Sequence, residues 1–266
     1  RFTLQVSQFD CTSCGSCADA CPSDALAMEP VKLTDASRAL WEYGLGLADK
    51  GSVFDPYSVK GSQFKQPLLE FSAACAGCGE TPYAKLLTQL FGDRVYWANA
   101  TGCSQAWGAP FPGIPYTTNK RGFGPAWTNS LFENNAELSL GLYLGSTQQR
   151  AAEKARVEKL LQVLACGMDN PKEGKGDAPE PAAMEKVKAA CESYLVAFDD
   201  FDASRSASDT LVAAIEASTG SLTNSAKRAC EGVLKFKDQL AKKTFWMFGG
   251  DGWAYDIGFG GLDHVV

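Results

Sequence analysis

The sequence contains almost no histidine and no long apolar run. Its one histidine among 266 residues is His264, which excludes a zinc site built from several histidines and catalysis that needs more than one. No apolar run approaches the roughly 18 residues needed to cross a bilayer, and the first residues do not resemble a signal peptide. We therefore expect a protein that is not embedded in a membrane.

Basic residues are also in deficit. Lysine and arginine total 25 against 31 aspartates and glutamates, which gives a formal net charge of −6 and a pI of about 5.0. Nucleic-acid-binding proteins normally show a basic stripe, so we expect no nucleic-acid partner. Apolar residues make up 45% and charged residues 21%, which predicts a globular chain of one large or two modest domains.

Cysteine, by contrast, is abundant and clustered. Seven of the ten cysteines lie in the first 103 residues. This clustering is typical of metal ligands, whereas the disulfides of a secreted protein are dispersed along the chain.

The first cysteine run has the spacing of a bacterial ferredoxin. Cys11, Cys14, Cys17 and Cys21 follow the pattern Cys-x2-Cys-x2-Cys-x3-Cys-Pro. In two-cluster ferredoxins the first three cysteines of such a run bind one [4Fe–4S] cluster and the fourth binds the other. We therefore expect half of a 2[4Fe–4S] ferredoxin-like module over residues 1–30, with the missing ligands outside this chain. A zinc site is the alternative for the same spacing.

A second group of cysteines leaves more than one interpretation open. Cys75 and Cys78 form a CxxC loop ahead of an expected helix, and Cys103 follows an expected strand. From spacing alone, a redox-active pair or a structural zinc site accounts for them as well as iron does. Glu80 by itself could be an acid that the helix dipole favours at a helix start.

Periodicity and turn residues predict a mixed α/β chain. We expect a short strand over residues 2–9, a linker over 31–66 and a second domain over 67–266. In that domain we expect a helix over 83–91, with Thr81 as its N-cap and Leu86, Leu87 and Leu90 buried, a strand over 95–98 and mostly loop over 102–125. Further helices are expected over residues 129–144, 148–164, 184–198, 209–218 and 221–242, with a mobile loop over 169–181 and a strand over 244–248.

A glycine-rich turn follows the last of these strands, at residues 249–252. The order strand, glycine turn, helix is typical of α/β sheets that bind ligands at the carboxyl ends of their strands. Glycines let the backbone approach a diphosphate, and Asp251 could hold Mg²⁺ through a carboxylate oxygen. A hairpin turn is the alternative, although no strand is expected after it.

Taken in order, these motifs resemble the C-terminal third of the single-chain pyruvate:ferredoxin oxidoreductases. The order is the ferredoxin run, the linker, CAGCGETPY, NATGCS, a long helical insertion and GGDGWAYDIGFGGLDHV. The resemblance implies an α/β thiamine-diphosphate-binding domain with a helical insertion at about 145–243, preceded by half of a 2[4Fe–4S] ferredoxin-like α+β module.

The resemblance also implies roles for single residues. Cys75, Cys78 and Cys103 would bind the [4Fe–4S] cluster nearest the thiamine diphosphate, and Glu80 and Cys103 would line that cofactor. Gly250, Asp251, Gly252 and Trp253 would form the diphosphate loop, with Asp251 on Mg²⁺. Cys11, Cys14, Cys17 and Cys21 would belong to the two outer clusters. Cys166, Cys191 and Cys230 match no ligand of the family, so we expect them to be ordinary thiols.

The function implied is oxidative decarboxylation of pyruvate to acetyl-CoA and CO₂. Electrons would pass singly through the clusters to ferredoxin or flavodoxin, in a homodimer located in the cytoplasm or in an anaerobic, mitochondrion-related organelle. The chain would be a fragment of that polypeptide, and no catalytic residue is assigned within it. The alternatives are the same core fused to a reductase domain that uses NADP⁺, a non-catalytic electron-transfer ferredoxin fusion, and an interaction module that holds zinc.

Overall fold

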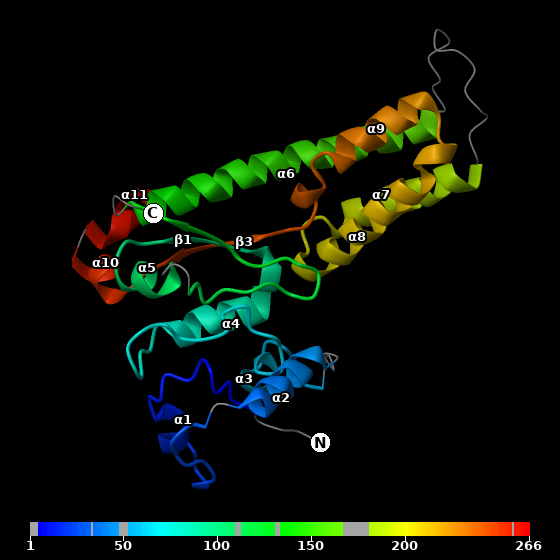
Figure 1. Cartoon of the computed structure of the whole chain (residues 1–266). Coiled ribbons are helices and arrows are strands. Elements are labelled where there is room, and N and C mark those ends of the chain that lie inside the picture. Colours follow the sequence, from blue (N-terminus) through cyan, green and yellow to red (C-terminus); the bar gives the residue numbers. More distant parts are fainter. Residues whose placement is uncertain are drawn as a thin grey trace. The chain divides into compact units, whose positions relative to one another are not determined.

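The chain folds into two compact units. The computed structural model describes residues 5–32, 34–47, 53–109, 113–130, 134–166, 181–256 and 258–266. One unit contains residues 1–139 and 245–266, and the other contains residues 140–244 (Figure 1). No helix among the described residues is both long enough and apolar enough to span a bilayer.

The first unit is built on a three-stranded sheet with the order β2-β1-β3. Its strands are β1 (Val95–Asn99), β2 (Ala126–Asn129) and β3 (Thr244–Phe248). β1 and β2 are parallel, with Trp97 opposite Trp127. The strands predicted over 95–98 and 244–248 are confirmed, and the sheet with its helices is an α/β arrangement. β2 was not predicted, since its four residues show no alternation; the helix expected from residue 129 is wrong at its start, because Asn129 ends this strand and the helix begins at Asn135.

Helix α4 (Thr81–Phe91) leads into the central strand. Its existence confirms the helix predicted over 83–91, but Glu80 is the N-cap residue and Thr81 already lies in the helix, where its hydroxyl donates to Ser72 Oγ across 2.9 Å. The short helix η1 (Gly92–Arg94) follows, and Gly92 has a φ of 58°, which a glycine adopts without strain.

The core of this unit contains more aromatic rings than leucines. Leu69, Ala84, Trp97 and Trp107 are its buried members, with Phe248 packed against them. The prediction that Leu86, Leu87 and Leu90 are buried is wrong, because all three are half-buried; the fully buried residues of α4 are Thr81, Ala84, Thr88 and Gln89.

A second helix stands where a loop was expected. Helix α5 (Cys103–Gly108) lies inside the predicted loop over 102–125. Gly102 precedes it with a φ of 137°, a backbone conformation that suits glycine. This turn allows a helix to begin four residues after Asn99, the last residue of β1.

The first residues contain only short helices. These are α1 (Ser16–Asp19), α2 (Asp35–Gly46) and α3 (Val59–Ser62). Residues 5–9 of the predicted strand are irregular or turn, so that part of the prediction is wrong, and residues 2–4 lie outside the described residues. Helix α2 lies in the predicted linker, where Thr34 Oγ1 accepts the Ser37 N–H and caps it.

The C-terminal residues form three short helices, the first of which carries the half-buried ring of Trp253. They are α10 (Asp251–Asp256), η4 (Gly258–Gly261) and α11 (Leu262–Val265). A Cβ placed on Gly249 or Gly260 would lie 2.6 Å or 2.0 Å from the ring of Trp253, so only glycine leaves room for it. His264 lies on α11 with its Nδ1 3.1 Å from Glu137 Oε1.

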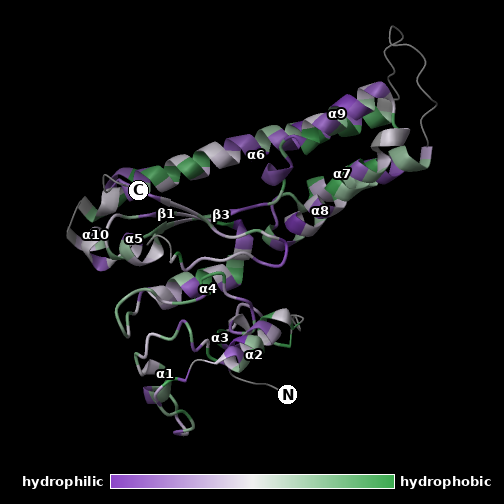
Figure 2. Ribbon diagram, in the orientation of Figure 1, coloured by the Kyte–Doolittle hydropathy of each residue, from purple (hydrophilic) through white to green (hydrophobic). Residues whose placement is uncertain are grey.

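The second unit is a set of helices around one apolar core. It contains most of α6 (Asn135–Cys166), then α7 (Pro181–Ala197), α8 (Phe201–Ser218), η2 (Thr219–Ser221), α9 (Asn224–Leu234) and η3 (Lys237–Gln239). Hydrophilic and hydrophobic residues are mixed along α6 and α9 (Figure 2), as expected of helices with one buried face. The helix predicted over 148–164 is confirmed as part of α6, and Val157, Leu160 and Leu164 on it are buried.

Several boundaries in this unit differ from the prediction, and the helices expected over 129–144 and 148–164 form one continuous helix, α6. Helix α8 starts eight residues before the predicted Asp209, at Phe201, where Asp200 Oδ1 accepts the Ala203 N–H and caps the helix start. Helix α9 ends at Leu234 and not at Lys242. The loop predicted over 169–181 lies outside the described residues except for Pro181, which begins α7. Cys191 and Cys230 are buried in the core, as expected of ordinary thiols, and the side chain of Cys166 is not described.

Candidate functional site

Three of the predicted motifs meet beside the sheet. Glu80 lies at the start of α4, Cys103 at the start of α5 and Gly250 in the turn after β3. A Cβ placed on Gly250 would lie 3.9 Å from both Glu80 Oε1 and Cys103 Cβ. Figure 1 shows α5 and α10 near one another, at the end where β3 leads into α10. The structure therefore brings together residues that are far apart in the sequence, around a position with no side chain of its own.

Glu80 is held in one orientation by a buried indole. Trp107 Nε1 donates to Glu80 Oε2 across 3.0 Å, and Trp107 is only 2% exposed. Glu80 Oε1 is also buried and has no partner within the described residues. A buried carboxylate oxygen without a partner costs free energy, so this atom is available to a donor on a ligand. Burial, with the charge of Glu80, raises the pKa of the neighbouring Tyr116 well above its usual value, so this phenol stays neutral.

The residues of the glycine turn differ in their surroundings. Asp251 and Gly252 are exposed, and Trp253 is half-buried. The indole Nε1 of Trp253 is buried without a partner among the described residues. An exposed carboxylate next to a backbone without side chains is a donor set suited to Mg²⁺ and a diphosphate. These residues and Glu80 therefore fit thiamine diphosphate with Mg²⁺.

The ferredoxin-type run presents its thiols to solvent. Cys11, Cys14 and Cys17 are exposed, and Cys21 is half-buried. Hydrogen bonds from Ser16 lower the pKa of Cys14 to about 7, with a further backbone bond from Gly77. The backbone of Ser23, followed by that of Ala25, lowers the pKa of Cys21, and the Ala25 N–H lies 3.3 Å from its sulfur. Iron binds thiolates, so these hydrogen bonds suit a cluster ligand.

The thiols of each group are not gathered into a ligand set. Within the described ranges, no three or more cysteine, histidine, aspartate or glutamate side chains are placed to hold a metal ion. In the second group Cys75 and Cys103 are exposed and Cys78 is half-buried. Exposed thiols on short loops are a donor set whose chemistry fits an iron–sulfur cluster.

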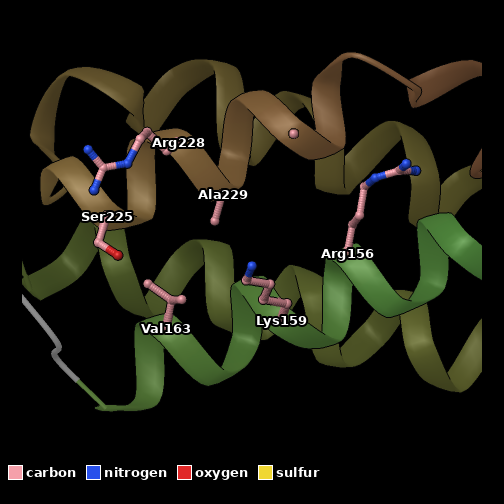
Figure 3. Close-up of a pocket in the computed structure, with 7 residues that line it drawn as sticks. Arg156, Lys159, Val163, Ser225, Arg228 and Ala229 are labelled. Carbon is pink, nitrogen blue, oxygen red and sulfur yellow. The ribbon is translucent and has the colours of Figure 1, made fainter.

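A basic pocket in the second unit was not predicted from the sequence. It has a volume of about 310 Å³ between α6 and α9, and three cationic residues, Arg156, Lys159 and Arg228, are among those that line it. Figure 3 shows the guanidinium groups of Arg156 and Arg228 on opposite sides, directed away from one another. Arg156 is already paired with Glu153 Oε2 across 2.6 Å. The cations therefore do not converge on one ligand position.

Sequence reasoning missed the residues that orient the site. Trp107, Tyr116, Ser16 and Gly77 were not among the candidates, since each acts on a candidate residue and matches no motif itself. Gly77 lies between Cys75 and Cys78 and Ser16 between Cys14 and Cys17, whereas no motif pointed to Trp107 or Tyr116.

Comparison with known proteins gives consistent results for the cluster run and for the whole chain. Residues 4–27 match the 4Fe-4S binding domain family. The whole chain is 46% identical to the pyruvate:ferredoxin oxidoreductase of Moorella thermoacetica and 45% identical to the pyruvate-flavodoxin oxidoreductase of Enterobacter agglomerans. The chain is homologous to one segment of these enzymes along its entire length. The resemblance found in the motifs is thereby confirmed.

This segment is a limited part of each relative. The chain spans 21% of the length of the two bacterial enzymes. It also matches the protein named pyruvate dehydrogenase [NADP(+)] of Cryptosporidium parvum with 42% identity, and there it spans 14% of the length. The relatives named for ferredoxin or flavodoxin and the relative named for NADP(+) therefore all contain the whole of this segment.

Proposed function

We propose that the chain is part of an enzyme that converts pyruvate to acetyl-CoA and CO₂ and passes the electrons singly through [4Fe–4S] clusters to ferredoxin or flavodoxin. The observation that carries this proposal is the meeting of Glu80, Cys103 and Gly250 beside the sheet, in a chain homologous to such oxidoreductases throughout. A non-catalytic electron-transfer protein would have no use for a carboxylate aimed at a glycine turn.

Two cofactors would share this region. Glu80 and the turn from Gly250 to Trp253 would hold thiamine diphosphate, with Asp251 on Mg²⁺, and Cys75, Cys78 and Cys103 would bind the nearest cluster. When bound, thiamine diphosphate supplies the carbanion chemistry that releases CO₂ from a 2-oxo acid, and a cluster accepts one electron at a time. This chain's part is to hold Glu80 Oε1 toward the glycine turn, and to keep that carboxylate away from water through Trp107.

The electron acceptor has a second candidate. Relatives of Cryptosporidium parvum and Euglena gracilis are named pyruvate dehydrogenase [NADP(+)], and the chain covers 14% of each. The same core could therefore deliver electrons to NADP⁺ through a further domain. The name of the Euglena protein includes the word mitochondrial, which supports an organelle as the alternative to the cytoplasm. A homodimer and the use of coenzyme A remain part of the proposal.

The test uses the complete polypeptide that contains this chain, purified without oxygen. We expect it to contain iron, sulfide, thiamine diphosphate and Mg²⁺, and to reduce a low-potential dye only when pyruvate and coenzyme A are both present. Ferredoxin, flavodoxin and NADP⁺ are then compared as acceptors. Iron without thiamine diphosphate would indicate the electron-transfer fusion, and zinc in place of iron would indicate the interaction module.

A further inference from the structure

The first turn of the long helix α6 contacts the chain at both ends of the glycine turn. We call residues 249–256 and 258–261 the glycine-turn segment; Phe248 directly precedes it, and α11 directly follows it. Residues 135–139 of α6 belong to the same compact unit as this segment. Figure 1 shows α11 beside this first end of α6. Two side chains of this turn, Asn135 and Glu137, make the contacts.

Asn135 holds the residue before the segment. It is fully buried, and its Nδ2 donates to the carbonyl of Phe248 across 3.4 Å. The N–H of Ala100 donates to the same carbonyl across 2.8 Å. The last residue of β3 is therefore held by two donors, one from α6 and one from the residue that follows β1. These bonds fix the point at which the chain enters the turn.

Glu137 contacts the other end of the segment. A Cβ placed on Gly261 would lie 2.1 Å from Glu137 Oε2 and 2.5 Å from its Oε1, so the carboxylate fills the space that a side chain at position 261 would need. Oε2 is buried and accepts no hydrogen bond among the described residues, so this contact is one of packing. Oε1 lies 3.1 Å from Nδ1 of His264, which is 78% exposed, and exposed pairs contribute little.

The contact at Gly261 continues to the turn through the neighbouring glycine. A Cβ placed on Gly260 would lie 2.0 Å from Trp253 Nε1, and one placed on Gly249 would lie 2.6 Å from Cε3 of the same ring. The indole of Trp253 therefore contacts both the beginning and the end of the glycine-turn segment. Glu137 packs on the residue next to this indole contact, so its side chain supports the arrangement from α6.

Contacts at both ends matter because the segment is rich in glycine. Glycine loses more conformational freedom than any other residue when it is ordered. A ligand that needs one conformation binds more weakly in proportion to the fraction of molecules that do not hold it. Side chains that hold the segment in advance therefore raise the affinity without touching the ligand.

We propose that Asn135 and Glu137 are positioning residues that hold the glycine-turn segment in the conformation that binds a diphosphate with its metal ion. Asn135 acts through Phe248 and Glu137 acts through Gly261, and neither is a ligand. The identity of the bound group rests on the proposed function. The support of the segment by α6 rests on the contacts alone.

The experiment compares Glu137→Ala and Asn135→Ala with the unaltered protein, in the complete polypeptide freed of thiamine diphosphate and Mg²⁺. Amide hydrogen exchange, followed by mass spectrometry, reports on the segment before any ligand is added. In both variants we expect the glycine-turn segment to exchange at least about fivefold faster, with the exchange of α8 unchanged. Calorimetric titration with Mg²⁺ and thiamine diphosphate should then show a roughly tenfold weaker affinity, as expected where about a tenth of the molecules hold the binding conformation.

Two further variants are the controls. Glu158→Ala removes the same kind of side chain from an exposed position on α6 and should leave both the exchange and the affinity unchanged. Glu137→Gln keeps the shape that packs on Gly261 and weakens only the exposed pair with His264. It should therefore stay within about threefold of the unaltered protein in both measurements.

Iron content is measured in every variant and should not change. Should Asn135→Ala fail to fold, Glu137→Ala carries the test, because Glu137 is only half-buried. Unchanged exchange of the segment in Glu137→Ala would overturn the inference, as would an equal effect of Glu158→Ala or faster exchange with unchanged affinity. An unaltered protein that binds no thiamine diphosphate would contradict the proposed function, and the exchange comparison would still decide whether the two residues hold the segment.

Discussion

The indole nitrogen of Trp107 and the carboxylate of Glu80 form a hydrogen bond 3.0 Å long, which joins the last turn of α5 to the N-cap of α4. Oε2 of Glu80 accepts this bond, while Oε1 has no partner among the described residues and faces the glycine turn. The same contact couples the position of α5 to that of α4. Trp107 therefore decides which oxygen of Glu80 faces Gly250.

Replacing Trp107 by phenylalanine tests this relationship. The ring contacts with Tyr116 and Phe248 would be kept, and the N–H donor would be lost. Hydrogen bonds to charged groups contribute about 1.5–3 kcal/mol, so we expect the affinity for thiamine diphosphate to fall by about tenfold or more. Calorimetric titration of the complete polypeptide measures the affinity. Trp127→Phe, in the same core, is the control, and equal affinities for the two variants would contradict the expectation.

Asp251 is expected to matter for the metal and not for the clusters. Its carboxylate is exposed in the turn after β3, in a different segment from every cysteine of the cluster groups. In the complete polypeptide, Asp251→Ala should abolish binding of Mg²⁺ and thiamine diphosphate and leave the iron content unchanged. Cofactor and iron analysis check this, with Asp263→Ala as the control in a neighbouring helix. Stoichiometric thiamine diphosphate in Asp251→Ala would remove Asp251 from the metal site.

Cys103 is expected to affect one cluster of three. It begins α5, directly after the turn at Gly102, and lies next to Gly250. Cys103→Ser should damage the cluster nearest thiamine diphosphate and leave the two outer clusters in place, since those have their own run of ligands. EPR and iron analysis of the reduced variant measure this. Three intact clusters with normal ferredoxin reduction would return Cys75 and Cys78 to the redox-pair interpretation.

The cysteines should differ strongly in reactivity in protein prepared without clusters. Hydrogen bonds lower the pKa of Cys14 to about 7, whereas burial raises the pKa of Cys191 to about 12 and that of Cys230 to about 11. The thiolate is the reactive form, so at about pH 8 iodoacetamide should label Cys14 and leave the buried pair unmodified. Labelling of Cys14 should rise as the pH passes through about 7. Mass spectrometry gives the rates, and denaturant should make all three cysteines reactive; fast labelling of Cys191 without denaturant would contradict its burial.

Glu153 makes the second unit sensitive to the loss of one arginine. Its side chain is fully buried, and its Oε2 is paired with Arg156, which is 38% exposed. Removing the arginine leaves a buried carboxylate without its charge partner. We expect Arg156→Ala to lower the free energy of unfolding by about 1–3 kcal/mol at neutral pH, less than for a fully buried pair because Arg156 is partly solvated. Urea unfolding measures it.

The pH dependence of the same unfolding gives a second readout. Burial raises the pKa of Glu153 above its usual value, so the folded state binds this proton more tightly than the unfolded state. Its contribution to stability is full below the usual pKa of glutamate and is lost as the pH rises through the raised pKa. Glu153→Gln should remove that loss of stability.

The control for Arg156→Ala is Arg205→Ala, which breaks a partly exposed pair with Asp209 at 3.7 Å. It should lower the free energy of unfolding by less than about 1 kcal/mol.

The sequence was most informative where a local pattern determines structure. The strands β1 and β3 are short apolar runs, and the buried face of α6 follows from the spacing of Val157, Leu160 and Leu164. Strand β2 forms instead by main-chain pairing with β1. Its four residues show no alternating pattern, so the sequence did not mark them as a strand. Helix α5 depends on a turn at Gly102 that was interpreted as the start of a loop.

In the candidate site, too, the sequence predicted some features and missed others. The motifs identified Glu80, Cys103 and Gly250 as candidates one by one, and their roles toward cofactors remain predictions. Their proximity could not be derived from spacing, because it depends on where α4, α5 and the turn after β3 come together. The contact of Trp107 with Glu80 and the approach of Gly77 to Ser16 also join residues of different segments. Such pairs become visible only when the chain is folded.

The strand order β2-β1-β3 has a consequence for synthesis on the ribosome. The central strand β1 ends at Asn99, whereas its partner β3 begins only at Thr244, after the whole second unit has been translated. At about 5–20 residues per second, one edge of β1 waits on the order of ten seconds for its neighbour. Trp97 and the aromatic core around Phe248 cannot be completed during that interval, so a nascent chain of this protein exposes an apolar strand edge to chaperones and to other nascent chains.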